Sequence, residues 1–568
     1  MIPSSRRIVS GLALATGLLL LPLPVPAKSS SWSDGKGGTF RGEPAQVLGP
    51  FALFQSGANG RRVRLRSLTD EECRRFQAEL ATKPARAASF ADAKGEVTRD
   101  LVGRVQRVEN RKLVAADLAG LPEPELVLVL AGSHNEDEGW KMVSNLGAFD
   151  ARVKRVFPGL VQTVFLGARH DEVQHQNMAV SANMTWLVAE LRQQPSMGSL
   201  RNFIPTREGT SMVLVSRTGV LLAAARASDV AAMRTFTDQV ADFLWAINPE
   251  NAAAWGDVAH YLKATRPVQF AEGRGEPVLV GHPLRPAVLR RYGVKRVAAQ
   301  LAVDAAGKVT PRLLPAPGDF APDLAPALEA ALTQAVVAPA IERGQPVAGE
   351  ITLVIDVPPA DPVHDADAIW LASAHYPVAA IDRWLVLRPI DVPEKEFDAE
   401  AGSLNASGQV VFKSFEVNSG KISRAAQMSA FNSDWFAAAG AGSVQPKEGE
   451  RQRIDEHTEL TWQAVKSQDG FVDMQGALAR DYCVGYAWAE VTMPAAAEAW
   501  LGLGSDDGVK LWLNGELVHD KWIRRQSRLD DDVIPLKLQK GPNRILIKIQ
   551  NATIDWSFIY RLRVKPPG

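Results

Sequence analysis

The stretch WLGLGSDDGVKLWLNGELVHD, residues 500–520, decides the fold of the C-terminal part of this chain. Trp500, Leu501 and Leu503 lead into a turn sequence at 504–508, and the run 509–513 then alternates apolar and polar residues as a half-buried strand does. Asn514-Gly515 follows, and this pair between alternating runs predicts a hairpin because both residues accept positive φ. We therefore expect a strand, a turn and a β-hairpin in this order.

The turn at 504–508 contains two adjacent acids, Asp506 and Asp507. Neighbouring carboxylates repel each other unless a cation, hydroxyl groups or backbone amides receive them. A ligand site is one interpretation of the pair. The other is a turn without any ligand, because Asp-Asp-Gly is also a good turn sequence.

Short strand patterns continue on both sides of this stretch and predict a β-sandwich of jelly-roll type over residues 361–568. The expected strands are 384–390, 462–465, 469–474, 486–491, 533–538, 544–549 and 557–564. Residues 399–458 interrupt them and form a long polar insertion.

Two stretches of the sandwich are LGLGSDDGVKLWLNGELVHD and DDDVIPLKLQKGPNRILIKIQNATIDWSF. In these stretches the sandwich resembles the carbohydrate-binding jelly rolls of secreted glycoside-degrading enzymes and, more distantly, the protective-antigen-type sugar sandwich. This resemblance implies that Asp506 and Asp507 hold calcium and sugar hydroxyls, which makes calcium the one candidate cofactor. Further ligand candidates are the acids that could add oxygen ligands and the tryptophans that could stack on sugar faces, namely Asp530, Asp531, Asp532, Trp522 and Trp556.

Length, charge and cysteine content set the bounds for the rest of the chain. At 568 residues it should form about three to five domains. Lys+Arg and Asp+Glu balance at 64 each, so no net charge draws the protein to nucleic acid or an anionic membrane. Cys73 and Cys483 are the only cysteines, and we expect two free thiols.

The N-terminus has the pattern of a secretory signal peptide, residues 1–27. Arg6-Arg7 precede an apolar core at 11–21, and Val25-Pro26-Ala27 offers a cleavage site. The apolar core is shorter than the ~20 residues of a membrane span. We expect a mature protein without a transmembrane segment that works in the periplasm or outside the cell.

Residues 28–82 predict a small antiparallel barrel with strands at 39–41, 45–48, 52–54 and 63–65. The pattern WSDGKGGTFRGEPAQVLGPFALFQ…RRVRLRSLTDEEC resembles the SH3-like homology domain of actin-assembly proteins. That resemblance implies a peptide-binding or spacer module. A purely structural barrel with a basic outer strand is the alternative.

Residues 86–262 alternate strands and helices in the order β-α-β-α-β-β-α, which is that of the thioredoxin core. ELVLVLAGSHN, VQTVFLGARHDEVQHQNM, MTWLVAE and SMVLVSRTG resemble the nucleoredoxin-like branch of that fold. The family's Cys-x-x-Cys is replaced here by the acidic sequence at 134–138, HNEDE. Because no thiolate is present, we expect no disulfide exchange.

Residues 266–358 predict a strand–turn–strand at 297–309, a helix at 323–337 and a closing strand at 350–357. HPLRPAVLRRYGVKRVAAQLAVDAAGKVTPRLL…LEAALTQAVVAPAIERGQPVAGEITLVIDV resembles the TonB C-terminal domain, which implies an α+β unit that binds a partner by strand addition. Val336-Val337 and His282-Pro283 depart from the family pattern, so we expect no energy transduction.

The sequence thus predicts a multidomain α/β plus all-β protein that is secreted, not an enzyme, and binds glycan through its sandwich. An interaction scaffold for envelope proteins is the alternative. A glycoside hydrolase or redox protein is less favoured, because a hydrolase needs two carboxylates across a cleft and neighbours on one turn rarely face each other.

Overall fold

The computed structural model describes residues 31–567 apart from short stretches, which are 57–59, 133–136, 168–170, 204–209, 227–229, 315–323, 393–401, 405–409, 413–423, 437–439, 477–479 and 554. The expected signal peptide lies outside the described residues. So do His134, Asn135 and Glu136, which stand in place of Cys-x-x-Cys, and much of the polar insertion.

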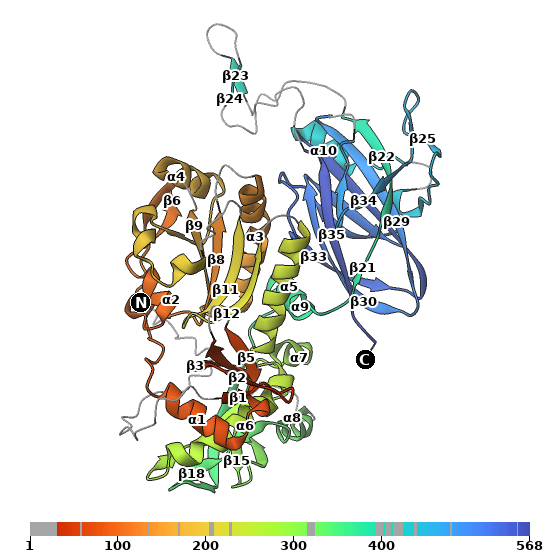
Figure 1. The fold of residues 1–568 in the computed structure, drawn as a ribbon. Helices are drawn as coiled ribbons and strands as arrows, with labels where there is room; N and C mark the ends of the chain where they lie inside the picture. Colours follow the sequence, from red (N-terminus) through yellow and green to blue (C-terminus); the bar gives the residue numbers. More distant parts are fainter. Residues whose placement is uncertain are drawn as a thin grey trace, which may run out of the picture. The chain divides into compact units, whose positions relative to one another are not determined.

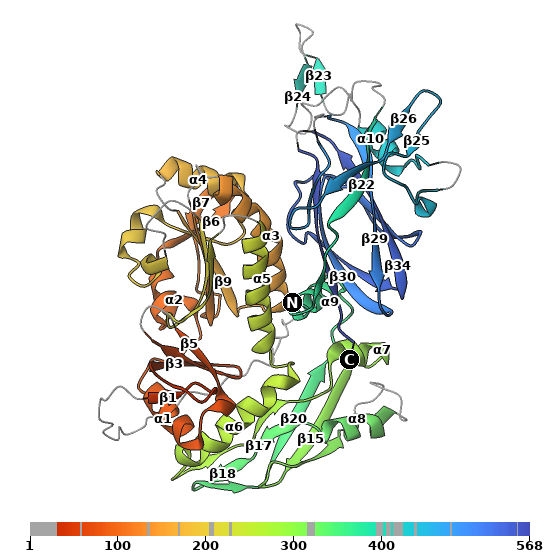
Figure 2. The ribbon, with the colours of Figure 1, turned by 45° about the vertical axis from the view of Figure 1, so that its right-hand side comes forward.

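Contacts divide the chain into two compact units (Figures 1 and 2). The first comprises residues 1–140, 154–228 and 236–365, and the second comprises 366–568 with the short stretches 141–153 and 229–235. The chain is mixed α/β with many separate sheets. Both cysteines are free and buried, as expected.

The first unit begins with a small antiparallel β structure in which β1 pairs with β2, and β3, β4 and β5 form a second sheet. Trp32, Phe54 and Phe76 meet in its core. Phe76 lies on α1, a helix that was not predicted from the sequence, although Thr69 and Glu72 form a capping box at its start. The bounds are β1 Ser31–Ser33, β2 Thr39–Arg41, β3 Glu43–Leu48, β4 Phe51–Gln55, β5 Arg61–Arg64 and α1 Asp70–Leu80.

A seven-stranded sheet follows, in the order β12-β11-β8-β9-β10-β6-β7. β8, β9 and β10 are parallel and the other pairs antiparallel. The elements from β8 to α5 keep the predicted order. The hairpin β6–β7, the short strand β10 and the helix α2 were not predicted. The bounds are α2 Glu96–Leu101, β6 Val105–Glu109, β7 Lys112–Ala115, β8 Leu126–Gly132, α3 Asp137–Val156, β9 Val161–Gly167, α4 Glu172–Ser181, β10 Leu187–Ala189, β11 Ser211–Ser216, β12 Leu221–Arg226 and α5 Val230–Ala246.

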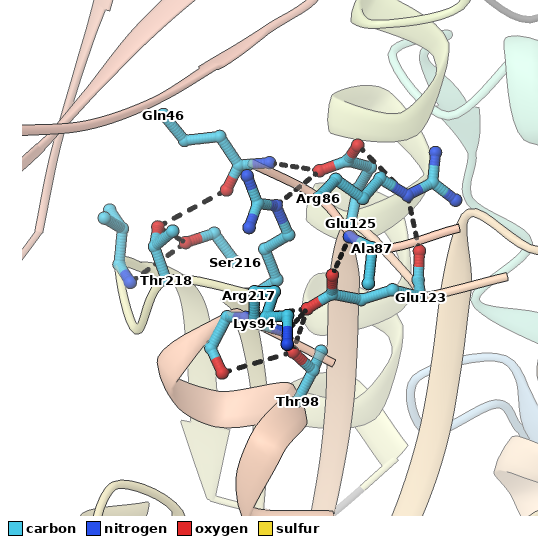
Figure 3. A network of polar contacts seen from close by, with 12 residues as sticks. Gln46, Arg86, Ala87, Lys94, Thr98, Glu123, Glu125, Ser216, Arg217 and Thr218 are labelled. Atoms are coloured by element: carbon cyan, nitrogen blue, oxygen red, sulfur yellow. Dashed lines mark hydrogen bonds and ion pairs between the residues drawn. The ribbon is translucent and has the colours of Figure 1, made fainter. Parts of the chain in front are cut away.

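A buried polar network ties the segment before α2 to this sheet (Figure 3). The Glu123 carboxylate is fully buried and accepts hydrogen bonds from the backbone N–H groups of Ala87 and Gly95 and from the Thr98 hydroxyl, at 2.5–2.7 Å. Burial alone would raise the pKa of Glu123, but these hydrogen bonds outweigh it and lower the pKa. Beside it, the Gln46 amide of β3 donates to Glu125. These contacts give both acids a structural role, although Glu123 is fully buried and Glu125 only half-buried.

Helix α6, Ala252–Gln269, is shared by two parts of the first unit. Tyr261 packs into the N-terminal core with Phe76. Trp255 and Leu262 pack instead against Val280 in the region predicted to be TonB-like. One helix therefore contributes to two neighbouring cores.

The region 266–358 contains three small sheets, β13-β18-β19, β14-β17 and β16-β15-β20. The predicted helix at 323–337 is too long. α8 ends at Leu332, and Val336 and Val337 belong to β17, because β-branched residues suit a strand better than a helix. The bounds are β13 Arg274–Gly275, β14 Val278–Gly281, α7 Pro286–Arg291, β15 Arg296–Val303, β16 Val309–Leu313, α8 Ala325–Leu332, β17 Val336–Ala338, β18 Ala340–Glu342, β19 Gln345–Val347 and β20 Gly349–Asp356.

The second unit contains two antiparallel sheets that enclose one core. One has the order β21-β35-β30-β33 with β28 also on β35, and the other has the order β27-β22-β29-β34-β31-β32. Trp384, Leu501 and Ile547 are among the core residues that come from both sheets. The bounds are β21 Val378–Ala379, β22 Arg383–Asp391, β27 Gln463–Lys466, β28 Phe471–Asp473, β29 Cys483–Met493, β30 Ala497–Asp506, β31 Val509–Leu513, β32 Glu516–Lys521, β33 Asp532–Leu538, β34 Gly541–Asn551 and β35 Ser557–Val564.

The predicted turn at 504–508 is shorter than expected. β30 extends to Asp506, and Asp507-Gly508 carry the chain from one sheet into the other, since β31 belongs to the opposite sheet. The Asn514-Gly515 hairpin is confirmed, because both residues have positive φ, 52° and 96°.

The insertion at 399–458 is more structured than its polar composition indicated. Its helix α10 buries Phe431, and a second apolar cluster, with Tyr486 and Trp462, lies on the outer face of the six-stranded sheet. Lys548 of β34 donates to the backbone carbonyls of Ala430, Phe431 and Ser433, at the C-terminal end of this helix. The bounds are α9 Pro362–Ala372, β23 Gly402–Leu404, β24 Val410–Phe412, α10 Arg424–Asn432, β25 Arg451–Arg453 and β26 Glu459–Thr461.

Candidate functional site

Asp507 joins three loops at one edge of the sandwich. Its Oδ1 accepts a hydrogen bond from the backbone N–H of Arg525 at 2.9 Å, and its Oδ2 accepts one from Ala552 at 2.7 Å. Burial raises the pKa of Asp507, although these two hydrogen bonds oppose the rise. Backbone amides therefore bind the Asp507 carboxylate. This is one of the three arrangements expected for adjacent acids, the others being a cation and hydroxyl groups.

Asp506 differs from its neighbour. It is 6% exposed, and burial together with the nearby charges of Asp507 and Asp555 raises its pKa to about 8. The backbone N–H of Ser527 donates to it and opposes the rise. Within the part of the chain that the structure describes, no Lys or Arg forms an ion pair with Asp506. This carboxyl group is therefore largely protonated at neutral pH, and it can both donate and accept a hydrogen bond.

The carboxylate of Asp530 is held in a buried ion pair. Asp530 and its partner Arg561 are 6% and 2% exposed, and the guanidinium of Arg561 donates to the carboxylate. Burial alone would raise the pKa of Asp530, but the charges of Arg561 and Arg563 outweigh it and lower the pKa. A structural role therefore accounts for this residue, which we had considered as an oxygen ligand.

Asp532 is also paired with cations. Its carboxylate accepts hydrogen bonds from Lys521 Nζ and Arg525 Nη2, each at 2.5 Å. Burial would raise its pKa, but the nearby His519 ring and the hydrogen bonds from Arg525 and Lys521 lower it. Asp531 is less well compensated, because burial raises its pKa to about 6 and its Oδ2 is buried without a hydrogen-bond partner.

The two tryptophans considered for sugar stacking lie in different environments. Trp556 is 2% exposed and belongs to the sandwich core, so its predicted stacking role is wrong: a sugar cannot reach a ring enclosed between the sheets. Trp522 is half-buried, and the guanidinium of Arg424 lies 5.3 Å from its ring centroid.

The residues that organise this edge were missed from the sequence. Arg525 is the main one, because its backbone N–H contacts Asp507 and its side chain contacts Ser505 and Asp532. A signal for it was present, since the basic run in KWIRRQSRLDDD directly precedes the acids that it neutralises. Asp555 gave no such signal.

The donor set does not form a complete metal site among the described residues, where no group of three His, Cys, Asp or Glu side chains is arranged to hold a metal ion. Every helix in the described part of the chain is too short or too polar to cross a membrane.

Comparisons with known proteins gave only distant similarities. No family model and no curated protein matches the chain. Similar solved structures include the GH31 α-xylosidase of Xanthomonas citri, with 18% identity, 15% of this chain and 9% of that chain covered and a TM-score of 0.14. The bacterioferritin comigratory protein of Xanthomonas campestris has 12% identity, coverages of 21% and 79% and a TM-score of 0.17. A family 35 carbohydrate-binding module from Clostridium thermocellum has 14% identity, coverages of 17% and 89% and a TM-score of 0.13. At these TM-scores the similarities argue for neither a fold nor a function.

Replacing Asp506 by asparagine should flatten the pH dependence of stability. Folding raises the pKa of Asp506 from 3.8 to about 8, so between these values the folded chain holds a proton that the unfolded chain has released. The contribution of the Asp506 carboxyl group to the free energy of unfolding is therefore full below about pH 4. This contribution falls as the pH rises towards 8, by up to about 1.4 kcal/mol per pH unit. Denaturant unfolding of wild type and Asp506→Asn at several pH values measures the difference. Parallel pH profiles for the two proteins would contradict the assignment.

Proposed function

We propose that this chain is a secreted, non-enzymatic cell-envelope protein whose C-terminal sandwich binds a glycan at the edge formed by Asp506 and Asp507. The observation that carries the proposal is the Asp506 carboxyl group, which is buried at a loop edge beside two other acids and has no cation partner among the described residues. Sugar hydroxyls satisfy such a group, because they donate and accept hydrogen bonds as it does.

Asp507 supports the same role by fixing the geometry. Both of its oxygens accept backbone hydrogen bonds, from Arg525 and Ala552, so the two loops that flank Asp506 are held in place. Calcium would use the same pair in a different way. A cation at Asp506 would displace its proton, so calcium affinity would rise with pH from about 6 to 9.

A non-enzymatic role agrees with the positions of the other acids. Arg561, Lys521 and Arg525 neutralise Asp530 and Asp532, so neither of these two acids is available as the second carboxylate that a glycoside hydrolase requires opposite Asp506.

The test is a panel of oligosaccharides against the full mature chain, with calcium and with a chelator. Asp506→Ala should weaken glycan binding about tenfold or more, since a buried polar group that contacts a ligand is worth about 1–3 kcal/mol. Asp506→Asn separates the two modes. It should keep part of the binding if Asp506 acts as a neutral hydrogen-bonding group, and abolish it if Asp506 binds calcium.

Glu516→Gln serves as the matched control, because Glu516 is an exposed acid of the same sandwich and starts β32. Unchanged affinity in Asp506→Ala, or loss of affinity in the control, would count against the site.

The second candidate function is a protein-interaction scaffold. It is favoured by exposed apolar side chains around α7, where Val288 and Tyr292 are 46% and 64% exposed. A chain that binds no glycan but captures an envelope protein through this helix would support the scaffold.

A further inference from the structure

A row of apolar residues crosses the outer face of the six-stranded sheet. It lies several residues along the strands from the Asp506 site. Leu385 lies opposite Trp488, Trp488 opposite Leu546, and Leu546 opposite Trp512, each on the neighbouring strand. Trp488 and Trp512 are half-buried and pack at the border of the second apolar cluster. Two strand spacings separate them, which is about 10 Å.

A row of charged residues lies beside the apolar row. Arg383 is opposite Lys466, and Glu490 is opposite Arg544. Arg383 and Glu490 both lie near Trp488, because all three residues line one pocket. Charged groups of both signs therefore border one side of the indole of Trp488.

A pocket of about 210 Å³ lies where the two rows meet. Its lining residues come from β22, β29 and the loop before β25, and are Arg383, Leu385, Glu448, Trp488, Ala489 and Glu490. Arg383 forms an ion pair with Glu448. The indole Nε1 of Trp488 is buried without a hydrogen-bond partner. Because this atom is buried, the half-buried indole offers the pocket its ring surface and not its N–H group.

The chemistry of the lining selects the class of ligand. The flat face of Trp488 suits the apolar face of a sugar ring, while the guanidinium and carboxylates suit its hydroxyl groups. The lining contains two acidic residues, Glu448 and Glu490, and one basic residue, Arg383. This excess of negative charge disfavours a phosphate or another anion. The volume is below the ~300 Å³ at which pockets for drug-sized ligands begin, so one ring is the unit that it accommodates.

We propose that the Trp488 pocket is a second saccharide subsite, which takes one ring of a neutral glycan. The proposal rests on the proposed function for its ligand class but uses none of the same residues. Gln550, whose carbonyl accepts from Asp507 N–H, is four residues along β34 from Leu546, about 14 Å away. One sugar ring cannot contact both sites.

Isothermal titration of the full mature chain with cellohexaose, xylohexaose, maltohexaose and mannohexaose tests this. Wild type should bind at least one of them, and Trp488→Ala should lower the affinity or the number of sites, with an expected loss of about tenfold or more at this subsite. Trp500→Ala is the matched control, because Trp500 is also half-buried but lies on the opposite sheet, where it contacts Tyr376. Melting curves verify that each variant is folded.

The outcomes separate the two proposals. Unchanged binding in Trp488→Ala would overturn the subsite and leave the Asp506 site standing. Loss of binding in Trp488→Ala, with Asp506→Ala unchanged, would support the subsite and refute the Asp506 site. Wild type binding none of the four would overturn both. Polygalacturonate is the control for charge. If it binds at Trp488 as tightly as the neutral oligosaccharides do, the assignment to a neutral glycan is refuted.

Discussion

Replacing Trp556 by alanine is expected to destabilise the sandwich by about 3–5 kcal/mol, without acting through a ligand site. The ring is 2% exposed in the core between the two sheets, and it lies so close to Gly485 that a Cβ there would come within 2.7 Å of it. Removing it leaves a cavity that the packed sheets fill only in part.

Chemical denaturation of the full chain measures this effect, with the midpoint of the sandwich transition as the readout. Trp556→Phe should lose much less, because it fills most of the volume. Trp522→Ala is the control, since Trp522 is half-buried. A Trp556→Ala protein as stable as wild type would show that this ring is not a core residue.

Replacing Arg561 by methionine should cost about 3–5 kcal/mol at neutral pH, because it leaves the Asp530 carboxylate buried without its partner. Methionine keeps much of the apolar volume, so the loss reports mainly on the charge. The double variant Arg561→Met with Asp530→Asn should recover part of the stability, since the unpaired charge is then gone.

The pH dependence gives an independent check. In wild type, Arg561 helps to hold the pKa of Asp530 below its ordinary value. Without that cation, burial should raise this pKa. The penalty of Arg561→Met should then be largest at high pH and shrink as the pH falls and Asp530 takes up a proton. Thermal melting at two pH values compares the variants. A loss of the same size in the single and double variants would contradict a dominant role of the charge.

Local sequence patterns were sufficient for most strands of the sandwich and for the helices α3, α4, α5 and α8, but not for α1, α2, α6, α7, α9 and α10. The Asn514-Gly515 hairpin forms because both residues accept positive φ, which is a property of the residues themselves. β35 spans residues 557–564, as predicted, because the residues on either side of it do not continue the strand pattern. The end of α8 was misplaced, because the helix had been extended into valines that pair with β14.

The candidate site could be predicted only in part. Adjacent acids at 506 and 507 mark an unusual turn, and their proximity follows from the sequence alone. The sequence alone does not show which of the two carboxyl groups is held by backbone hydrogen bonds. That depends on the backbone amides of Arg525 and Ala552, which come from other loops. Asp530 looked equivalent to Asp506 until Arg561, thirty-one residues away, proved to neutralise it.

The sequence by itself determined most strands of the sandwich and the position of the paired acids, because dihedral preference and side-chain alternation act over a few residues. The tertiary structure alone decided that β30 and β31 belong to opposite sheets, that Trp556 is enclosed, and that Trp488 lines a pocket. Burial and charge compensation depend on which distant strands become neighbours, and that register is fixed only when the two sheets pack on one core.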